Sequence, residues 1–193
     1  MNTEEIFSKI FDNEYKKAKT ARFDYEVYTG KRSFRGLVEL EASLHHIVIS
    51  HSKIDDNNKL FEIESARNHL QRIAIELTEE VAETLCCVIV DKLDPFSKHP
   101  FLCKIMLVHK PDRCDMYWEE LRKNQQLIRN GRSLKGEKEN FDKCYECFKI
   151  ALEELWKLNA QIPSSPFWSH LFTLIVSIGS LIIGFLLSLL LKK

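Results

Sequence analysis

Four side chains at helical spacing could do chemistry in this sequence. Glu62, His69 and Glu76 recur at intervals of seven residues, and Arg72 lies within one helical turn of His69 and Glu76. A histidine titrates near neutrality and a neighbouring carboxylate adjusts its pKa, so the group could supply a general acid and base. Solvated helix faces and subunit contacts carry the same pattern. We interpret the four residues as a subunit or partner surface and keep catalysis as the alternative.

Cysteine and histidine pairs suggest a second kind of site. Cys144 and Cys147 form a C-x-x-C, and His109 with Cys114 could complete a tetrahedral zinc site. The motif falls within a strongly helical segment, where residues three apart face a core without any metal, and the second pair lacks a standard spacing. We therefore predict no metal and no cofactor, although Cys144 and Cys147 as ligands stay open. Glycine-rich phosphate loops and nucleophile motifs do not occur in the sequence.

The elements that would position these residues are predicted to be helices. Apolar residues recur every three or four positions, and turn residues separate the segments. We predict an all-α bundle of about six helices with short links, whose third and longest helix carries Glu62 to Glu76. The predicted helices span about residues 3–29, 34–54, 59–93, 95–111, 112–130 and 137–158. Residues 131–133 are assigned to a loop, Pro95 is expected to end the third helix, and Ser33 to cap the second. In the second predicted helix, the residues expected to face the core are Leu37, Leu40, Leu44, Ile47, Val48 and Ile54. The sixth predicted helix carries apolar residues at Phe141, Cys144, Phe148, Ala151, Leu152 and Leu155.

Residues 171–191 contain no charge, proline or amide side chain, and only two lysines follow. As a helix this segment would be about 31 Å long, which matches a hydrocarbon core of roughly 30 Å. We predict a single C-terminal transmembrane helix, a cytosolic bundle over residues 1–160 and a linker over 161–170. Phe167 and Trp168 are predicted to lie at the membrane interface.

Small residues follow one side of the predicted span. They suit close helix packing or pore lining in a ring of identical helices, or they are merely tolerated in a lone anchor. This stripe consists of Thr173, Ser177, Ser180, Gly184 and Ser188.

Charge and composition narrow the function further. The 28 basic residues balance the 28 acidic ones, which argues against direct nucleic-acid binding because clustered positive charge is its usual signature. The cysteines precede the predicted span on its cytosolic side, so we expect free thiols.

The segment Ser65-Ala66-Arg67-Asn68-His69-Leu70-Gln71-Arg72 resembles one found in bacterial helical proteins related to HEPN domains. With one membrane span, the layout is similar to the small membrane accessory proteins of type VI-B CRISPR loci, which implies oligomeric, pore-like action in anti-phage defence. HEPN ribonucleases carry an Arg and a His separated by four to six residues, and no such pair occurs here.

We therefore predict a non-enzymatic, tail-anchored protein that self-associates and perturbs the bilayer. Its expected partners are the lipid bilayer, further copies of itself and a possible protein partner. The alternatives are a membrane-anchored adaptor that recruits a soluble partner and a divergent HEPN-like ribonuclease that uses His69 and Arg72.

Overall fold

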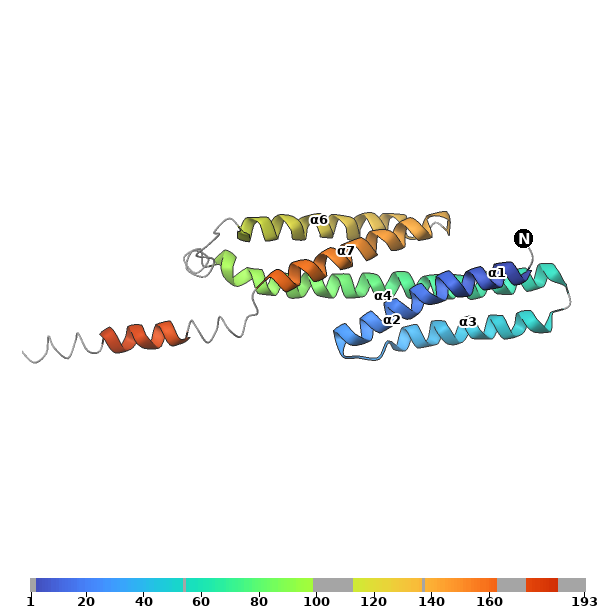
Figure 1. Cartoon of the computed structure of the whole chain (residues 1–193), viewed down its shortest axis with the longest axis horizontal. Helices are drawn as coiled ribbons and strands as arrows, with labels where there is room; N and C mark the ends of the chain where they lie inside the picture. The colour runs from blue at the N-terminus through green and yellow to red at the C-terminus, as the bar shows by residue number, and fades with distance from the viewer. Residues whose placement is uncertain (1–2, 54, 99–112, 137, 163–172, 184–193) are drawn as a thin grey trace, which may run out of the picture.

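One long helix, α4, organises the whole molecule. The computed structural model describes residues 3–53, 55–98, 113–136, 138–162 and 173–183. Helix α4 (Asp56–Lys98) lies at the centre, with α1, α2 and α3 along its N-terminal half and α6 and α7 along its C-terminal half (Figure 1). The described residues contain helices and no strands, so the all-α prediction is confirmed for them.

The N-terminal arm is one helical run with a local irregularity. Helix α1 (Thr3–Ile10) passes through a π-helical turn (Phe11–Tyr15) into α2 (Lys16–Thr29). The run ends at Gly30, whose φ of +66° is the left-handed conformation that glycine adopts at low cost. Helix α3 (Phe34–Ser52) follows, and the Ser33 hydroxyl accepts a hydrogen bond from the Gly36 N–H at 3.0 Å. The predicted Ser33 cap is confirmed.

Two boundaries of α4 differ from the prediction. Its first turn begins at Asp56 because the Asp55 carboxylate accepts hydrogen bonds from the N–H groups of Asn57 and Asn58. At the other end, the expectation that Pro95 stops the helix is wrong, since α4 continues to Lys98. Proline removes one backbone hydrogen bond. The turn before it is nevertheless held by Leu93, which is buried in the core.

The C-terminal half of the bundle is a helical hairpin packed on α4. Helix α6 (Arg113–Leu134) and α7 (Phe141–Gln161) are joined through Gly136 and a short 3₁₀ turn (Lys138–Asn140). The prediction of a loop over residues 131–133 is wrong, because these residues continue α6. A Cβ at Gly131 would lie 2.9 Å from the Phe148 ring. Gly131 therefore serves a close approach of α6 and α7 and does not break the helix.

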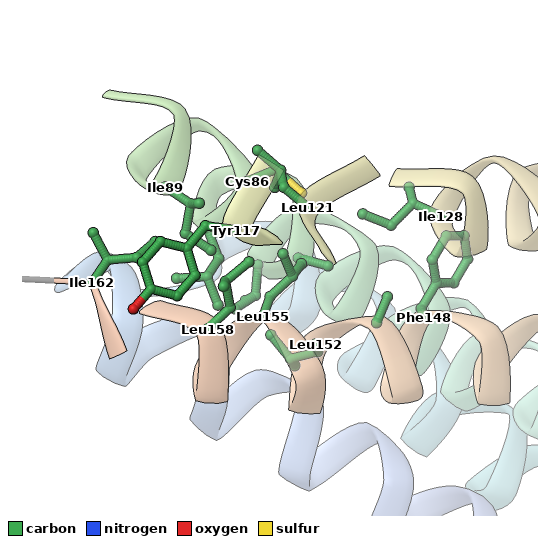
Figure 2. Close-up of a cluster of buried hydrophobic side chains, with 14 of the residues drawn as sticks. Cys86, Ile89, Tyr117, Leu121, Ile128, Phe148, Leu152, Leu155, Leu158 and Ile162 are labelled. Atoms are coloured by element: carbon green, nitrogen blue, oxygen red, sulfur yellow. The ribbon is translucent and has the colours of Figure 1, made fainter. Parts of the chain in front are cut away.

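The main hydrophobic core lies where α4, α6 and α7 meet. Figure 2 shows side chains from the three helices converging on one apolar cluster. Phe148, Leu121 and Leu155 are fully buried there. The inward positions predicted for residues 141–155 are confirmed, because Phe141, Cys144, Phe148, Ala151, Leu152 and Leu155 are all buried. A second cluster, around Ile63, Leu70 and Leu77, joins α4 to the N-terminal arm.

The predicted C-terminal span is described only in part. Residues 173–183 form a helix that Figure 1 places clear of the bundle. No helix within the described ranges is both long enough and apolar enough to cross a bilayer. Residues 171–172 and 184–191 of the predicted span lie outside the described residues, as do the linker positions Phe167 and Trp168 and most of the predicted helix 95–111.

Candidate functional site

The structure brings the four predicted surface residues onto the side of α4 that meets α3. His69 Nδ1 lies 2.6 Å from a Glu39 carboxylate oxygen, and Arg72 donates to the other Glu39 oxygen at 3.1 Å. We call the whole set the polar seam: Arg35, Glu39 and His46 of α3 with Glu62, His69, Arg72 and Glu76 of α4. Sequence reasoning found the α4 members, and it missed those on α3.

The polar seam is a ladder of charged pairs along two antiparallel helices. Arg35 pairs with Glu76 at 2.8 Å near one end, and His46 lies 2.6 Å from Glu62 near the other. The ring of His46 stacks on the ring of His69, with the two centroids 5.3 Å apart. Alternating acids and bases on facing helices specify register as well as holding the helices together.

Glu39 is the centre of this ladder. Burial alone would raise the pKa of its carboxyl, but the hydrogen bonds from His69 and Arg72 outweigh burial and hold that pKa below its ordinary value of 4.5. Glu39 is therefore a carboxylate at neutral pH, and it already engages both basic groups that the nuclease alternative requires. The arrangement can clamp two helices together, and it presents His69 to a carboxylate of its own chain.

Arg72 and Glu76 also border a shallow cavity beside the polar seam. The cavity has a volume of about 350 Å³ and lies where α4 meets the turn between α6 and α7. Gln71, Lys135 and Phe141 contribute to its lining. Arg72 and Glu76 thus belong both to the polar seam and to the lining of this cavity. Their role as a partner surface stays a prediction.

A second charged cluster, which sequence analysis missed, joins α4 to α6. Glu79 forms ion pairs with Arg132 at 2.7 Å and with Lys135 at 2.6 Å, and Arg132 also forms an ion pair with Glu83. Burial would raise the pKa of Glu79, but the hydrogen bonds from Lys135 and Arg132 lower it overall. In the sequence, this cluster was indicated only by the seven-residue repeat that continues from Glu76 to Glu83. The repeat does not indicate which helix supplies the basic partners.

The π-helical turn places a carboxylate in the interior. Glu14 is only 2% exposed. Its Oε1 accepts hydrogen bonds from the Arg67 and Gln71 side chains at 3.4 Å, and its Oε2 has no hydrogen-bond partner. Lys17 lies 3.9 Å from Oε2. A π turn inserts one residue per turn relative to an α-helix, which rotates Glu14 toward α4. Its position explains how the N-terminal arm is fixed to the centre of the bundle.

The predicted cysteine pair is divided between the core and its edge. Cys144 is buried and its thiol donates to the Gly131 carbonyl at 3.2 Å, whereas Cys147 is partly exposed. Burial raises the pKa of the Cys144 thiol to about 11, and a protonated thiol is a poor metal ligand. Across the described ranges no three His, Cys, Asp or Glu side chains gather in a way that could hold a metal ion. His109 lies outside those ranges.

Three of the predicted small residues near the C-terminus can be placed. The Ser177 hydroxyl donates to the Thr173 carbonyl at 2.7 Å, and the Ser180 hydroxyl donates to the Val176 carbonyl at 2.8 Å. Both hydroxyls are therefore satisfied within their own helix. Gly184 and Ser188 lie outside the described residues.

The apolar side chains of helix 173–183 are exposed around its circumference. Their exposed fractions range from 44% for Ile175 to 74% for Leu181. Its polar side chains are the hydroxyls of Thr173, Ser177 and Ser180, and it lacks the charged side that a surface helix of a soluble domain presents to water. Its exposed apolar residues are Leu174, Ile175, Val176, Ile178, Leu181, Ile182 and Ile183.

Helix α3 faces α4 through small residues, contrary to the prediction. Its buried positions, which we call the inner face, are Gly36, Ser43 and Ser50. A Cβ at Gly36 would lie 3.1 Å from Leu77, and the Ser43 hydroxyl donates to the Ala66 carbonyl at 3.1 Å. Two helices that approach this closely exclude large side chains between them.

Three of the apolar residues expected to face the core lie on the other side of α3, whereas Leu40 and Ile47 are half-buried and Ile54 lies outside the described residues. Leu37, Leu44 and Val48 are exposed, so their predicted inward orientation is wrong. With Phe34 and Val38 they form what we call the outer face. A groove of about 290 Å³ lies between α2 and α3. Gly36 and Leu40 line it on α3, and Arg22, Phe23 and Glu26 line it on α2.

Comparison of the chain with protein-family models, curated proteins and solved structures finds no match.

Proposed function

We propose that this protein is a membrane-tethered helical bundle that self-associates and perturbs the bilayer once assembled. One observation carries the proposal: helix 173–183 exposes seven large apolar side chains and contains no charged residue. An apolar helix without a charged side is stable in a protein core or in lipid. The sequence extends the same apolar character over residues 171–191.

The chemistry of the tether supports lipid as its environment. Unpaired polar groups are costly in hydrocarbon, so a membrane helix must satisfy its hydroxyls internally or against a neighbouring helix. Ser177 and Ser180 already donate to carbonyls one turn earlier in the same helix. Small residues on one side then leave room for a second helix to pack closely.

The polar seam supports a structural function for the bundle in preference to catalysis. His69 and Arg72 both contact Glu39, so the two groups that a ribonuclease would need serve helix pairing. The anti-phage role implied by the resemblance stays a prediction.

A membrane adaptor is the second candidate, and the exposed apolar outer face of α3 favours it. A soluble partner could cover Phe34, Leu44 and Val48 as well as a second copy could. A single subunit in detergent that binds another protein would favour the adaptor.

Flotation with liposomes tests the tether in the full-length chain. The variant Ile178→Asp/Leu181→Asp places two carboxylates near the middle of the predicted span, where each costs about 3 kcal/mol of insertion free energy. We expect the wild type to float with the vesicles and release an entrapped dye, and the variant to do neither. The matched control Ile178→Leu/Leu181→Ile keeps the apolar character and should behave as the wild type. Equal flotation of the charged variant, or wild-type protein that stays in the aqueous fraction, would refute the tether.

A further inference from the structure

The outer face of α3 is an exposed stripe of apolar residues that Glu41 and His45 interrupt. Phe34, Leu37, Val38, Leu44 and Val48 follow one side of the helix at intervals of three, four and seven residues. Their exposed fractions run from 37% for Leu37 to 79% for Phe34. From Phe34 to Val48 the stripe extends about 21 Å at the rise of an α-helix. Exposed apolar patches of this extent mark interaction surfaces.

The polar seam removes most charges of α3 from the neighbourhood of this stripe. Arg35 is drawn toward α4 by its ion pair with Glu76, and Glu39 by its ion pair with Arg72 and its contact with His69. Glu41 and His45 are the polar residues that lie within the stripe, and both are exposed. The outer face thus carries one acid and one imidazole, four residues apart.

This charge pattern is complementary to itself in one orientation. In a two-fold contact, residue i meets residue j of the other copy, and j meets i. Suppose that two α3 helices pack antiparallel through their outer faces, with the two-fold axis at the level of Ser43 along each helix. Glu41 of each copy then faces His45 of the other. In a parallel pair, Glu41 would face Glu41, which is repulsive. The positions of the acid and the imidazole therefore favour the antiparallel pair.

The apolar residues fit the same antiparallel register. Val38 of one copy then faces Val48 of the other on both sides of the axis, and Leu44 lies beside its own counterpart at the centre. Apolar contacts thus flank the two Glu41–His45 pairs, in which an imidazole N–H can donate to a carboxylate.

We propose that the outer face of α3 is the self-association surface of this protein, and that its occupant is α3 of a second copy in antiparallel orientation. The inference rests on the proposed function for self-association and adds the surface, the register and the symmetry. It does not depend on how the C-terminal segment meets lipid.

Disulfide trapping in the full-length protein in detergent tests the register. With exposed Cys87 changed to Ser in every sample, the variant Val38→Cys/Val48→Cys should form interchain disulfides on oxidation, because the two Cβ atoms must come within about 3.5–4.5 Å. Each single variant should give at least tenfold less dimer. Met116→Cys/Ile150→Cys, at positions on α6 and α7 that are 45% and 40% exposed, should give none. Efficient dimers from the single variants would indicate a parallel pair and overturn the proposal.

Charge exchange supplies a second test that does not depend on oxidation. Glu41→Lys and Leu44→Glu should each weaken self-association at least tenfold, measured as particle mass against concentration, with an unchanged far-ultraviolet circular dichroism spectrum. The exchange Glu41→His/His45→Glu should restore it, since each acid again faces an imidazole.

Each of the remaining outcomes would show that the outer face of α3 is not the self-association surface, and would overturn the proposal. An unchanged oligomer mass in Leu44→Glu and Glu41→Lys would place self-association on another surface, while the proposed function stands. Loss of vesicle flotation in Leu44→Glu without a change in mass would make the face a lipid contact. A wild type that is a single subunit at every concentration would refute both this inference and the proposed self-association.

Discussion

At the residue scale, Glu39 connects the largest number of polar groups between α3 and α4. It contacts His69 at 2.6 Å and Arg72 at 3.1 Å, and its side chain is mostly buried. A carboxylate in this position stabilises the fold only while it is ionised. The stability of the helix pair should therefore depend on pH in the acid range.

We expect Glu39→Gln to lower the free energy of unfolding by about 1.5–3 kcal/mol at neutral pH, the usual contribution of a hydrogen bond to a charged group. The pKa of Glu39 is lower in the folded chain than its ordinary 4.5, so its contribution is fully present above 4.5 and is lost as pH falls through the folded value. The variant should accordingly lose less stability than the wild type below about pH 4.5. Denaturant titrations at several pH values measure this difference.

The exposed Glu146 on α7 provides the matched control. Glu146→Gln should change the free energy of unfolding by less than about 0.5 kcal/mol at neutral pH. If the free energies of unfolding of the wild type and of Glu39→Gln fell in parallel as the pH is lowered, the stabilising role assigned to the Glu39 carboxylate would be contradicted.

Single residues also show why some boundaries could not be predicted. A glycine in a polar context is typical of a turn, and Gly136 confirms this with a φ of +115°. Gly131 has the same local context, but it is helical because the Phe148 ring occupies the space of its missing side chain. The sequence around Gly131 contains no information on Phe148, so only tertiary packing distinguishes the two glycines.

At the element scale, α3 has two usable faces, and the sequence favoured the wrong one. Leu37, Leu44 and Val48 have helical spacing, and so do Gly36, Ser43 and Ser50. Hydrophobic periodicity selects the apolar face for the core. The polar seam and the close approach to α4 instead select the small residues. Periodicity therefore predicted the existence and bounds of α3 well, but it placed Leu37, Leu44 and Val48 on the wrong side of the helix.

This orientation predicts opposite effects for adjacent residues. Ser43→Leu should lower the free energy of unfolding by about 1–3 kcal/mol, because a large side chain does not fit at a position only 1% exposed. Leu44→Ser should change it by less than about 0.5 kcal/mol at a dilution at which the subunits are separate, because Leu44 is 51% exposed. Thermal or denaturant unfolding measures both. The reverse order of the two effects would show that the inner and outer faces have been exchanged.

At the scale of the whole molecule, long periodic segments made the bundle predictable. The positions of α2, α4 and α7 follow from repeated apolar residues over many turns, and the core of α7 was identified residue by residue. The π-helical turn at Phe11–Tyr15 and the partners of Glu62 to Glu76 depend on contacts between distant segments. Those contacts are the part of the site that sequence reasoning missed.

By the two proposals above, the bundle carries two association devices at different places. The outer face of α3 lies on the N-terminal half of the bundle, and the apolar helix 173–183 follows its C-terminal end (Figure 1). A chain with both devices can meet lipid and further copies at once. The central claim is thus an assembly in the membrane.

The mass of the particle extracted from membranes with a mild detergent tests this claim most directly. We predict that the full-length protein is recovered in the membrane fraction, and that the protein component of the particle has a mass that is a multiple of the 22.7 kDa chain. Recovery from the aqueous fraction as a single 22.7 kDa chain would contradict the account.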